Sequence, residues 1–216
     1  MSLALVPVKS LAASKSRMLP KLTREQLEQL SLAMLSDVVE ALCGVDAVDR
    51  VVVATPDAKV AAAARLAGAD TLLRPDPGLN AAIDAAAVDL LASGEPFLVV
   101  LGDVAGARSE ELTQLFDAAH ELERPCATLA PSRDGGTSAL LRMPWDAIPS
   151  RFGRDSAKAH RDAASEAGVA LREIALPSLA IDLDRPEDLA LFMDHESAAN
   201  GGGARTRTLL RSLGWE

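Results

Sequence analysis

Apolar runs of strand length alternate along the chain with segments of helical periodicity. The continuous runs predict strands at 3–8, 50–54, 70–73, 97–101, 126–130, 138–143 and 171–176. Segments with apolar residues three and four positions apart predict six helices. The first follows a capping box at Thr23–Gln26, the second ends near Gly68, and the third spans 80–93. The fourth is capped by Ser109, and the last two begin near Ser156 and Pro186. Alternation through short loops predicts a three-layer α/β sandwich around a mostly parallel, Rossmann-like sheet.

Sheets of this kind bind their ligands at the carboxyl ends of the strands. The segments after Val8, Ala54 and Leu101 and those around Asp182 are therefore the places to look for a site. The periodic pattern ends near His195, which predicts one domain over residues 1–195 and a flexible tail over residues 196–216 that contains three consecutive glycines.

Composition narrows the classes of partner. A net charge of −9 over 216 residues disfavours nucleic acids and anionic membranes, because the overall field repels phosphate polymers. The apolar runs are far shorter than the ~20 residues of a spanning helix, and the first residues lack a basic region and a cleavage pattern. We therefore expect a cytoplasmic protein with no membrane partner. The oligomeric state stays open, with a homodimer as one alternative.

A basic loop follows the first predicted strand. Lys9, Lys15 and Arg17 fall within nine residues, interspersed with serines that include Ser16. Cations and hydroxyl groups at the carboxyl end of a strand suit a triphosphate. The alternative is a solvated basic loop with no ligand.

Three carboxylates follow apolar stretches. Asp103 comes after the most hydrophobic strand, where an unpaired charge costs free energy unless it binds a partner or a metal ion. Asp182 and Asp184 follow a second apolar stretch, and we expect one of them to face the site while the other caps the helix at Pro186. Hard oxygen ligands suit Mg²⁺, which bridges phosphates. The alternative for each is a turn or cap residue.

Two loops contain glycine together with hydroxyl side chains. The first, 134–138, reads Asp-Gly-Gly-Thr-Ser, and either binds an anion through Thr137 and nearby backbone N–H groups or is a hairpin turn. The second, 151–160, contains Gly153 and places Ser156 at a helix start, which is a potential anion site. His160 lies one turn into that helix, where it is either part of the site or a residue of the helix face.

Several common catalytic motifs are absent from the sequence. It has no Gly-x-Ser-x-Gly, no Walker loop, no Gly-x-Gly-x-x-Gly and no His/Cys cluster for zinc. Acyl transfer by a serine or cysteine nucleophile is therefore disfavoured. Phosphoryl or nucleotidyl transfer needs mainly positioning, cations and a metal ion, and this sequence supplies those parts.

In their order along the chain, these segments resemble the 2-phospho-L-lactate guanylyltransferase family, named CofC in archaea and FbiD in actinobacteria. The resemblance spans roughly residues 3–192. It rests on Pro7-Val8-Lys9, Lys15-Ser16-Arg17, Leu79-Asn80, Gly102-Asp103, Asp134 to Thr137, Arg151 to Gly153 with Asp155-Ser156 and His160, Asp182 to Asp184, and Pro186 to Leu189.

The resemblance implies a glycosyltransferase-A-like nucleotidyltransferase fold. It also implies that GTP is joined to 2-phospho-L-lactate, phosphoenolpyruvate or 3-phosphoglycerate with release of pyrophosphate, in coenzyme F-420 biosynthesis. Alternatives are a nucleotidyltransferase with another acceptor, of the molybdenum-cofactor type, and a nucleotide-binding relative without catalysis.

Roles of single residues follow from the same resemblance. Lys15 would contact phosphates with Lys9, Ser16 and Arg17 close by, while Leu79 and Asn80 would lie near the base. Asp103, Asp182 and Asp184 would hold Mg²⁺. Thr137, Gly153 and Ser156 would receive the phosphorylated acid. One run departs from the family pattern, because Val104-Ala105-Gly106 stands where Leu-Pro usually follows the aspartate.

Overall fold

The computed structural model describes residues 1–13, 16–19, 21–194 and 202–215, except for the side chains of Ala13 and Ser16. These residues form one seven-stranded sheet in the order β3-β2-β1-β4-β6-β5-β7. Its strands are β1 (Leu3–Pro7), β2 (Arg50–Thr55), β3 (Asp70–Leu73), β4 (Phe97–Val100), β5 (Cys126–Pro131), β6 (Thr137–Met143) and β7 (Ala170–Glu173).

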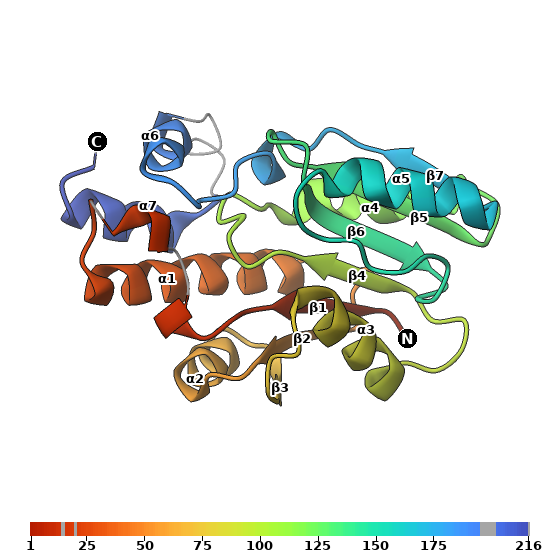
Figure 1. Ribbon diagram of the computed structural model, residues 1–216, viewed down its shortest axis with the longest axis horizontal. Coiled ribbons are helices and arrows are strands. Elements are labelled where there is room, and N and C mark those ends of the chain that lie inside the picture. Colours follow the sequence, from red (N-terminus) through yellow and green to blue (C-terminus); the bar gives the residue numbers. More distant parts are fainter. Residues whose placement is uncertain (14–15, 20, 195–201, 216) are drawn as a thin grey trace.

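Strand β6 runs antiparallel to its neighbours β4 and β5, and the other pairings are parallel (Figure 1). The predicted mostly parallel sheet is confirmed. Because β1, β2, β3 and β4 share one direction, their carboxyl ends meet at a single edge. The loops after these strands therefore lie together, as the rule for open α/β sheets requires.

Helices cover both faces of the sheet and complete the three predicted layers. They are α1 (Arg24–Cys43), α2 (Ala58–Leu66), α3 (Leu79–Leu90), α4 (Ser109–His120), α5 (Ser156–Ala167), α6 (Pro186–Asp194) and α7 (Ala204–Ser212). Apolar residues of α1, α2 and α4 pack on one face, and those of α3 and α5 pack on the other. None of these helices has the length and apolar character needed to cross a lipid bilayer.

The helix starts were predicted with one error. The capping box at the start of α1 is present, with Thr23 and Gln26 exchanging both hydrogen bonds. Ser109, however, is the first residue of α4 and makes no capping bond. Its hydroxyl donates to the carbonyl of Ala41 at 2.8 Å, and so ties α4 to α1 instead.

A third apolar cluster lies at one end of the molecule, where α7 packs along α1 and α6 lies beyond α7 (Figure 1). It combines residues from both termini with residues of two loops at the sheet edge: Met18, Leu22, Leu27, Leu30, Met34, Ala105, Ile181, Leu183, Leu189, Phe192 and Leu210. We call it the terminal cluster. It supports the loops that follow β1 and β4 and the segment that precedes α6.

Part of the predicted flexible tail is a helix that packs in the terminal cluster. A flexible tail was expected over 196–216, but residues 204–212 form α7, with Thr206 and Leu210 fully buried. Asp37 of α1 accepts the backbone N–H groups of Arg205 and Thr206 at 3.0 and 2.9 Å. Burial raises the pKa of Asp37, and these hydrogen bonds oppose the rise. A cap supplied by another helix was not visible in the local pattern. Residues 195–201 lie outside the described part.

Candidate functional site

The loop after β1 is held by a carboxylate from the loop after β2. The carboxylate of Asp57 accepts the N–H of Leu11 at 3.0 Å and the hydroxyl of Ser10 at 3.4 Å, while its other oxygen caps α2 through Lys59 N. Although burial opposes the shift, these hydrogen bonds lower the pKa of Asp57. A fixed negative charge therefore shapes the start of the basic loop.

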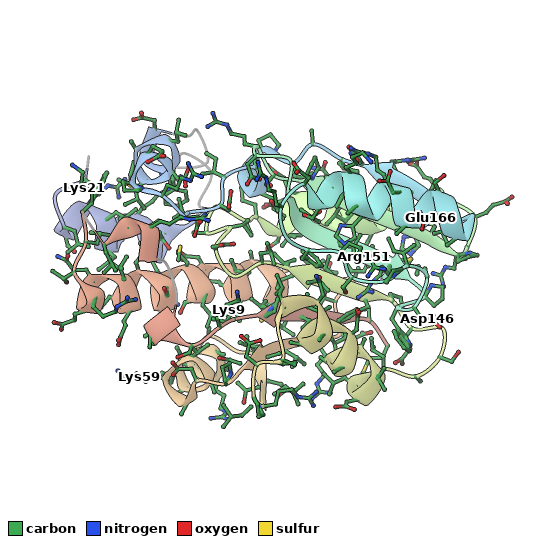
Figure 2. All side chains as sticks on the ribbon, in the orientation of Figure 1. Lys9, Lys21, Lys59, Asp146, Arg151 and Glu166 are labelled. Atoms are coloured by element: carbon green, nitrogen blue, oxygen red, sulfur yellow. The ribbon has the colours of Figure 1, made fainter. Side chains whose placement is uncertain are left out.

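The predicted basic residues of this loop are described only in part. Lys9 is exposed directly after β1, at the centre of the molecule in Figure 2. Arg17 follows in a short 3-10 helix (Ser16–Met18) and is also exposed. Lys15 and the side chain of Ser16 lie outside the described part, so their predicted contacts with phosphate stay predictions.

A mostly apolar cleft opens beside Lys9, at the carboxyl ends of β1 and β2. It is lined by Pro7, Val8, Lys9, Ala54, Thr55, Pro56, Arg74, Pro75, Asp76, Leu79 and Ala82. Leu79, predicted to lie near a base, is one of these residues. Its apolar walls suit a flat ring with a few polar neighbours. We call this the apolar cleft.

Asn80 uses its side chain elsewhere. Its Nδ2 donates to the carbonyl of Phe152 at 3.0 Å, and its Oδ1 accepts the N–H of Phe152 at 2.7 Å. Asn80 therefore joins α3 to the loop before α5, which was predicted to bind the acid. This link between two segments was not part of the sequence prediction.

Asp103 and the Asp182–Asp184 segment lie next to each other. The N–H of Leu183 donates to the carbonyl of Asp103 at 3.1 Å. Gly102 lets β4 approach β1 closely, because an added Cβ would lie 3.1 Å from Cγ2 of Val8. The strand ends that carry Lys9 and Asp103 are therefore adjacent. The segment with Asp184 lies beside them at the same edge of the sheet.

The run after Asp103 is anchored although it lacks the usual proline. Val104 and Ala105 are fully buried, Ala105 within the terminal cluster. At Gly106 an added Cβ would lie 2.8 Å from the carbonyl oxygen of Ser178, so a glycine is needed for this close packing. Burial and close backbone contact thus fix a loop that the family pattern fixes with a proline.

Asp182 and Asp184 face the same cleft, although only one of them was expected to face the site. Both line a second, charged cleft, while the alternate residues Ile181 and Leu183 pack into the terminal cluster. Residues two apart in an extended chain share a face, so the expectation that only one of the two would face the site was wrong. The carboxylate of Asp188 accepts the N–H groups of Asp184 and Arg185, at the start of α6.

We call this second opening the charged cleft. It is lined by Arg17, Arg133, Asp134, Ala180, Ile181, Asp182, Asp184, Arg185, Glu187, Asp188 and Leu191. Arg17 forms a 2.6 Å ion pair with Asp184 across it. Arg133 and Arg185 also line it and were not predicted, although Arg185 directly follows Asp184 and Arg133 directly precedes the predicted 134–138 loop. The cleft thus combines guanidinium groups, a type that suits phosphate, with carboxylates, a type that suits a hard metal ion.

The donor set suits Mg²⁺ if substrate phosphates complete its coordination. Among the described side chains, no three or more His, Cys, Asp or Glu residues gather closely enough to hold a metal ion by themselves. Mg²⁺, however, usually takes one or two carboxylates and fills its octahedron with water and phosphate oxygens. Asp103 and one of Asp182 or Asp184 fit that requirement.

The two glycine-containing loops lie together at the edge of the sheet. Loop 132–136 joins antiparallel β5 and β6, so it is a hairpin, and Gly135 O also accepts the N–H of Ala157 in the first turn of α5. Gly153 has a φ of +134°, which a residue with a side chain rarely adopts. Thr137 and Ser156 are buried and their hydroxyls are 3.1 Å apart. Two of the three residues predicted to receive an acid, Thr137 and Ser156, are therefore brought together, and Gly153 lies three residues before Ser156 in the same loop.

Comparison with known sequences decides the family. A sequence model of the family described as "Guanylyl transferase CofC like" matches residues 2–216. The chain belongs to the CofC-like guanylyl transferase family. The phosphoenolpyruvate guanylyltransferase of Rubrobacter xylanophilus is 40% identical over 87% of this chain and 91% of its own. The phosphoenolpyruvate guanylyltransferase of Sphaerobacter thermophilus is 36% identical over 90% of this chain and 93% of its own.

Other relatives of this CofC-like chain carry a different acceptor in their names. The 3-phospho-D-glycerate guanylyltransferase of Colwellia psychrerythraea is 31% identical over 87% of this chain and 89% of its own.

Among solved structures, a putative nucleotide-diphospho-sugar transferase from Desulfovibrio desulfuricans G20 has a TM-score of 0.77 over 98% of this chain and 94% of its own, at 15% identity. A nucleotidyl transferase from Methanothermobacter thermautotroptrophicus has a TM-score of 0.65 over 93% of this chain and 99% of its own, at 18% identity. These structures confirm the predicted nucleotidyltransferase-like fold.

Proposed function

We propose that this chain transfers the guanylyl group of GTP to a small phosphorylated acid and releases pyrophosphate, as a step in coenzyme F-420 biosynthesis in the cytoplasm. Phosphoenolpyruvate is the acceptor we place first, because the relatives at 36% and 40% identity are named for it. 2-Phospho-L-lactate and 3-phosphoglycerate are the other candidates.

One juxtaposition carries the proposal. The Arg17–Asp184 ion pair and the Leu183–Asp103 hydrogen bond bring the basic loop and the acidic residues to one edge of the sheet. The apolar cleft lies beside Lys9, and Thr137 lies on β6, the strand next to β4. We place the base in the apolar cleft, the triphosphate beside Lys9, Lys15 and Arg17, and the acid at Thr137, Gly153 and Ser156.

The chemistry needs little from the side chains beyond positioning and charge. A phosphate oxygen of the acid forms a bond to the α-phosphorus of GTP, and the bond to the pyrophosphate oxygen breaks. The attacking oxygen is already anionic near neutral pH, so no general base is required. Lys9, Lys15 and Arg17 stabilise the charge that moves onto pyrophosphate. Mg²⁺ held by Asp103 with Asp182 or Asp184 supplies further charge neutralisation when it is bound.

The proposal is tested with purified protein, Mg²⁺ and GTP, to which each of the three acids is added in turn. We expect pyrophosphate release with at least one acid, measured by a coupled assay, and a product mass equal to the acid plus a guanylyl group. ATP, CTP and UTP serve as nucleotide controls and should react poorly. Absence of pyrophosphate release with all three acids would overturn the proposed function.

Replacing Arg17 by alanine should weaken GTP binding without destabilising the fold. The Arg17–Asp184 pair is largely exposed, and such pairs contribute under about 1 kcal/mol to folding. Loss of a charge-assisted contact with phosphate should raise the KM for GTP about tenfold. The measurement is initial-rate kinetics with GTP varied and the acid saturating.

Lys21 provides the matched control, because it is exposed in the same basic segment but lies near the far end of the molecule (Figure 2). Lys21→Ala should leave the KM for GTP within about twofold of the wild-type value. Equal effects of the two substitutions would mean that Arg17 acts only through the overall charge.

A further inference from the structure

His160 is buried in the first two turns of α5, and both of its ring nitrogens are hydrogen-bonded. Nε2 lies 2.9 Å from the backbone nitrogen of Arg151, and Nδ1 lies 3.1 Å from the hydroxyl of Thr137. The Ser156 hydroxyl is 3.1 Å from the same Thr137 oxygen. His160 thus connects the loop before α5 with the two hydroxyl groups to which we assign the acid.

The contact with Arg151 determines where the imidazole carries its proton. A backbone N–H can only donate, so Nε2 must accept and is unprotonated. Burial, with the nearby charge of Arg142 as the next cause, lowers the pKa of His160 to about 4, so the ring is neutral near pH 7. The single ring proton is therefore on Nδ1, which donates to Thr137.

This tautomer decides how many hydroxyl protons are left for a ligand. Thr137 and Ser156 have two hydroxyl protons, and the hydrogen bond between them uses one. Because Nδ1 of His160 donates, the second proton stays available for an anion. In the opposite tautomer Nδ1 would accept the proton of Thr137, and none would be left.

A β-bulge in β6 turns Thr137 toward His160. Ala130 pairs with Ala139 but Pro131 pairs with Thr137, so Ser138 is an extra residue on β6. Ala139 packs in the cluster formed with α4, and in a regular strand residue 137 would point to that same face. The bulge re-aims it to the α5 side, which is a known use of bulges near functional sites.

We propose that His160 is a positioning residue for the acceptor: its Nδ1–H tautomer, fixed by the Arg151 N–H, keeps one hydroxyl proton of the Thr137–Ser156 pair free to donate to the phosphorylated acid. This inference rests on the proposed function. It goes beyond it by assigning a role to a buried side chain whose two ring nitrogens are both engaged by protein groups. Because neither nitrogen is left for the substrate, His160 acts through Thr137.

Two substitutions separate the role of the proton from that of the ring volume. His160→Leu fills much of the space but removes both hydrogen bonds, while His160→Asn can place an amide N–H near the position of Nδ1. We expect His160→Leu to raise the KM for phosphoenolpyruvate at least about tenfold and to leave the KM for GTP within about twofold. His160→Asn should recover part of the loss. His120→Leu, at the exposed end of α4, is the control.

The tautomer itself is measured on the wild-type protein with ¹⁵N-labelled histidine, by long-range ¹H–¹⁵N correlation spectra. We expect the Nδ1–H pattern for the His160 ring, assigned by its loss in His160→Asn. An Nε2–H pattern would overturn the inference, even if the leucine variant fails to fold. So would an active wild type whose KM for the acid is unchanged in His160→Leu. An inactive wild type would instead overturn the proposed function, and this inference with it.

Discussion

Replacing Asp103 by asparagine should lower the rate of guanylyl transfer at least about 100-fold. The substitution keeps the shape of the side chain and removes its charge. The backbone contact between Asp103 O and Leu183 N does not depend on the side chain, so the loop should keep its position. The loss should appear in kcat at saturating GTP and acid, because a metal ligand stabilises charge that develops during transfer.

Two measurements distinguish this outcome from misfolding. The melting temperature of Asp103→Asn should stay near the wild-type value, and higher Mg²⁺ concentrations should restore part of the rate. Asp117→Asn, an exposed aspartate on α4, is the control and should have no effect. Near-normal turnover in Asp103→Asn would remove Asp103 from the metal site.

Replacing Asp57 by asparagine should lower kcat/KM for GTP by about tenfold or more. One carboxylate oxygen accepts from Leu11 and Ser10, and the other caps α2. Asparagine is as good a helix cap as aspartate but has only one acceptor oxygen, so it cannot fill both roles. We expect the cap to be kept and the start of the basic loop to be released.

Asp57→Ala is the companion variant, because it removes the helix cap as well. It should lower the free energy of unfolding by about 1 kcal/mol more than Asp57→Asn, measured by urea denaturation. Since the pKa of Asp57 lies below its ordinary value of 3.8, its contribution to stability should be intact at neutral pH and lost only as the pH falls below that value. Unchanged GTP kinetics in both variants would show that the loop does not need this anchor.

Local patterns were sufficient for most elements of the fold. Apolar runs bounded by turn residues predicted strands such as Asp70–Leu73 with the bounds that the structure shows. The order of the strands depends on contacts between distant residues, and single-sequence periodicity carries no information about such pairs. The same limit explains α7, whose few apolar residues are buried only because α1, α6 and the sheet-edge loops surround them.

Candidate site residues could be predicted where the chemistry lies within one short segment. Lys9, Asp103 and Gly153 were proposed from residue type and from their position after strands or before a helix, and their roles stay predictions. Asn80 and His160 act through partners 72 and 9 to 23 residues away, so their roles could not be read locally. The bulge that re-aims Thr137 is likewise a property of strand pairing, which a period-two pattern does not reveal.

The residues that line the two clefts are synthesised at different times, because the charged cleft rests on the terminal cluster and the apolar cleft does not. All residues that line the apolar cleft have been made once Ala82 is added to the growing chain. The charged cleft needs residues up to Leu191, and the cluster beneath it is complete only with Leu210. Because a chain is synthesised from its amino end, the residues that line the apolar cleft leave the ribosome well before those that line the charged cleft. A chain clipped before α6 would accordingly keep every lining residue of the first cleft and lose part of the lining of the second.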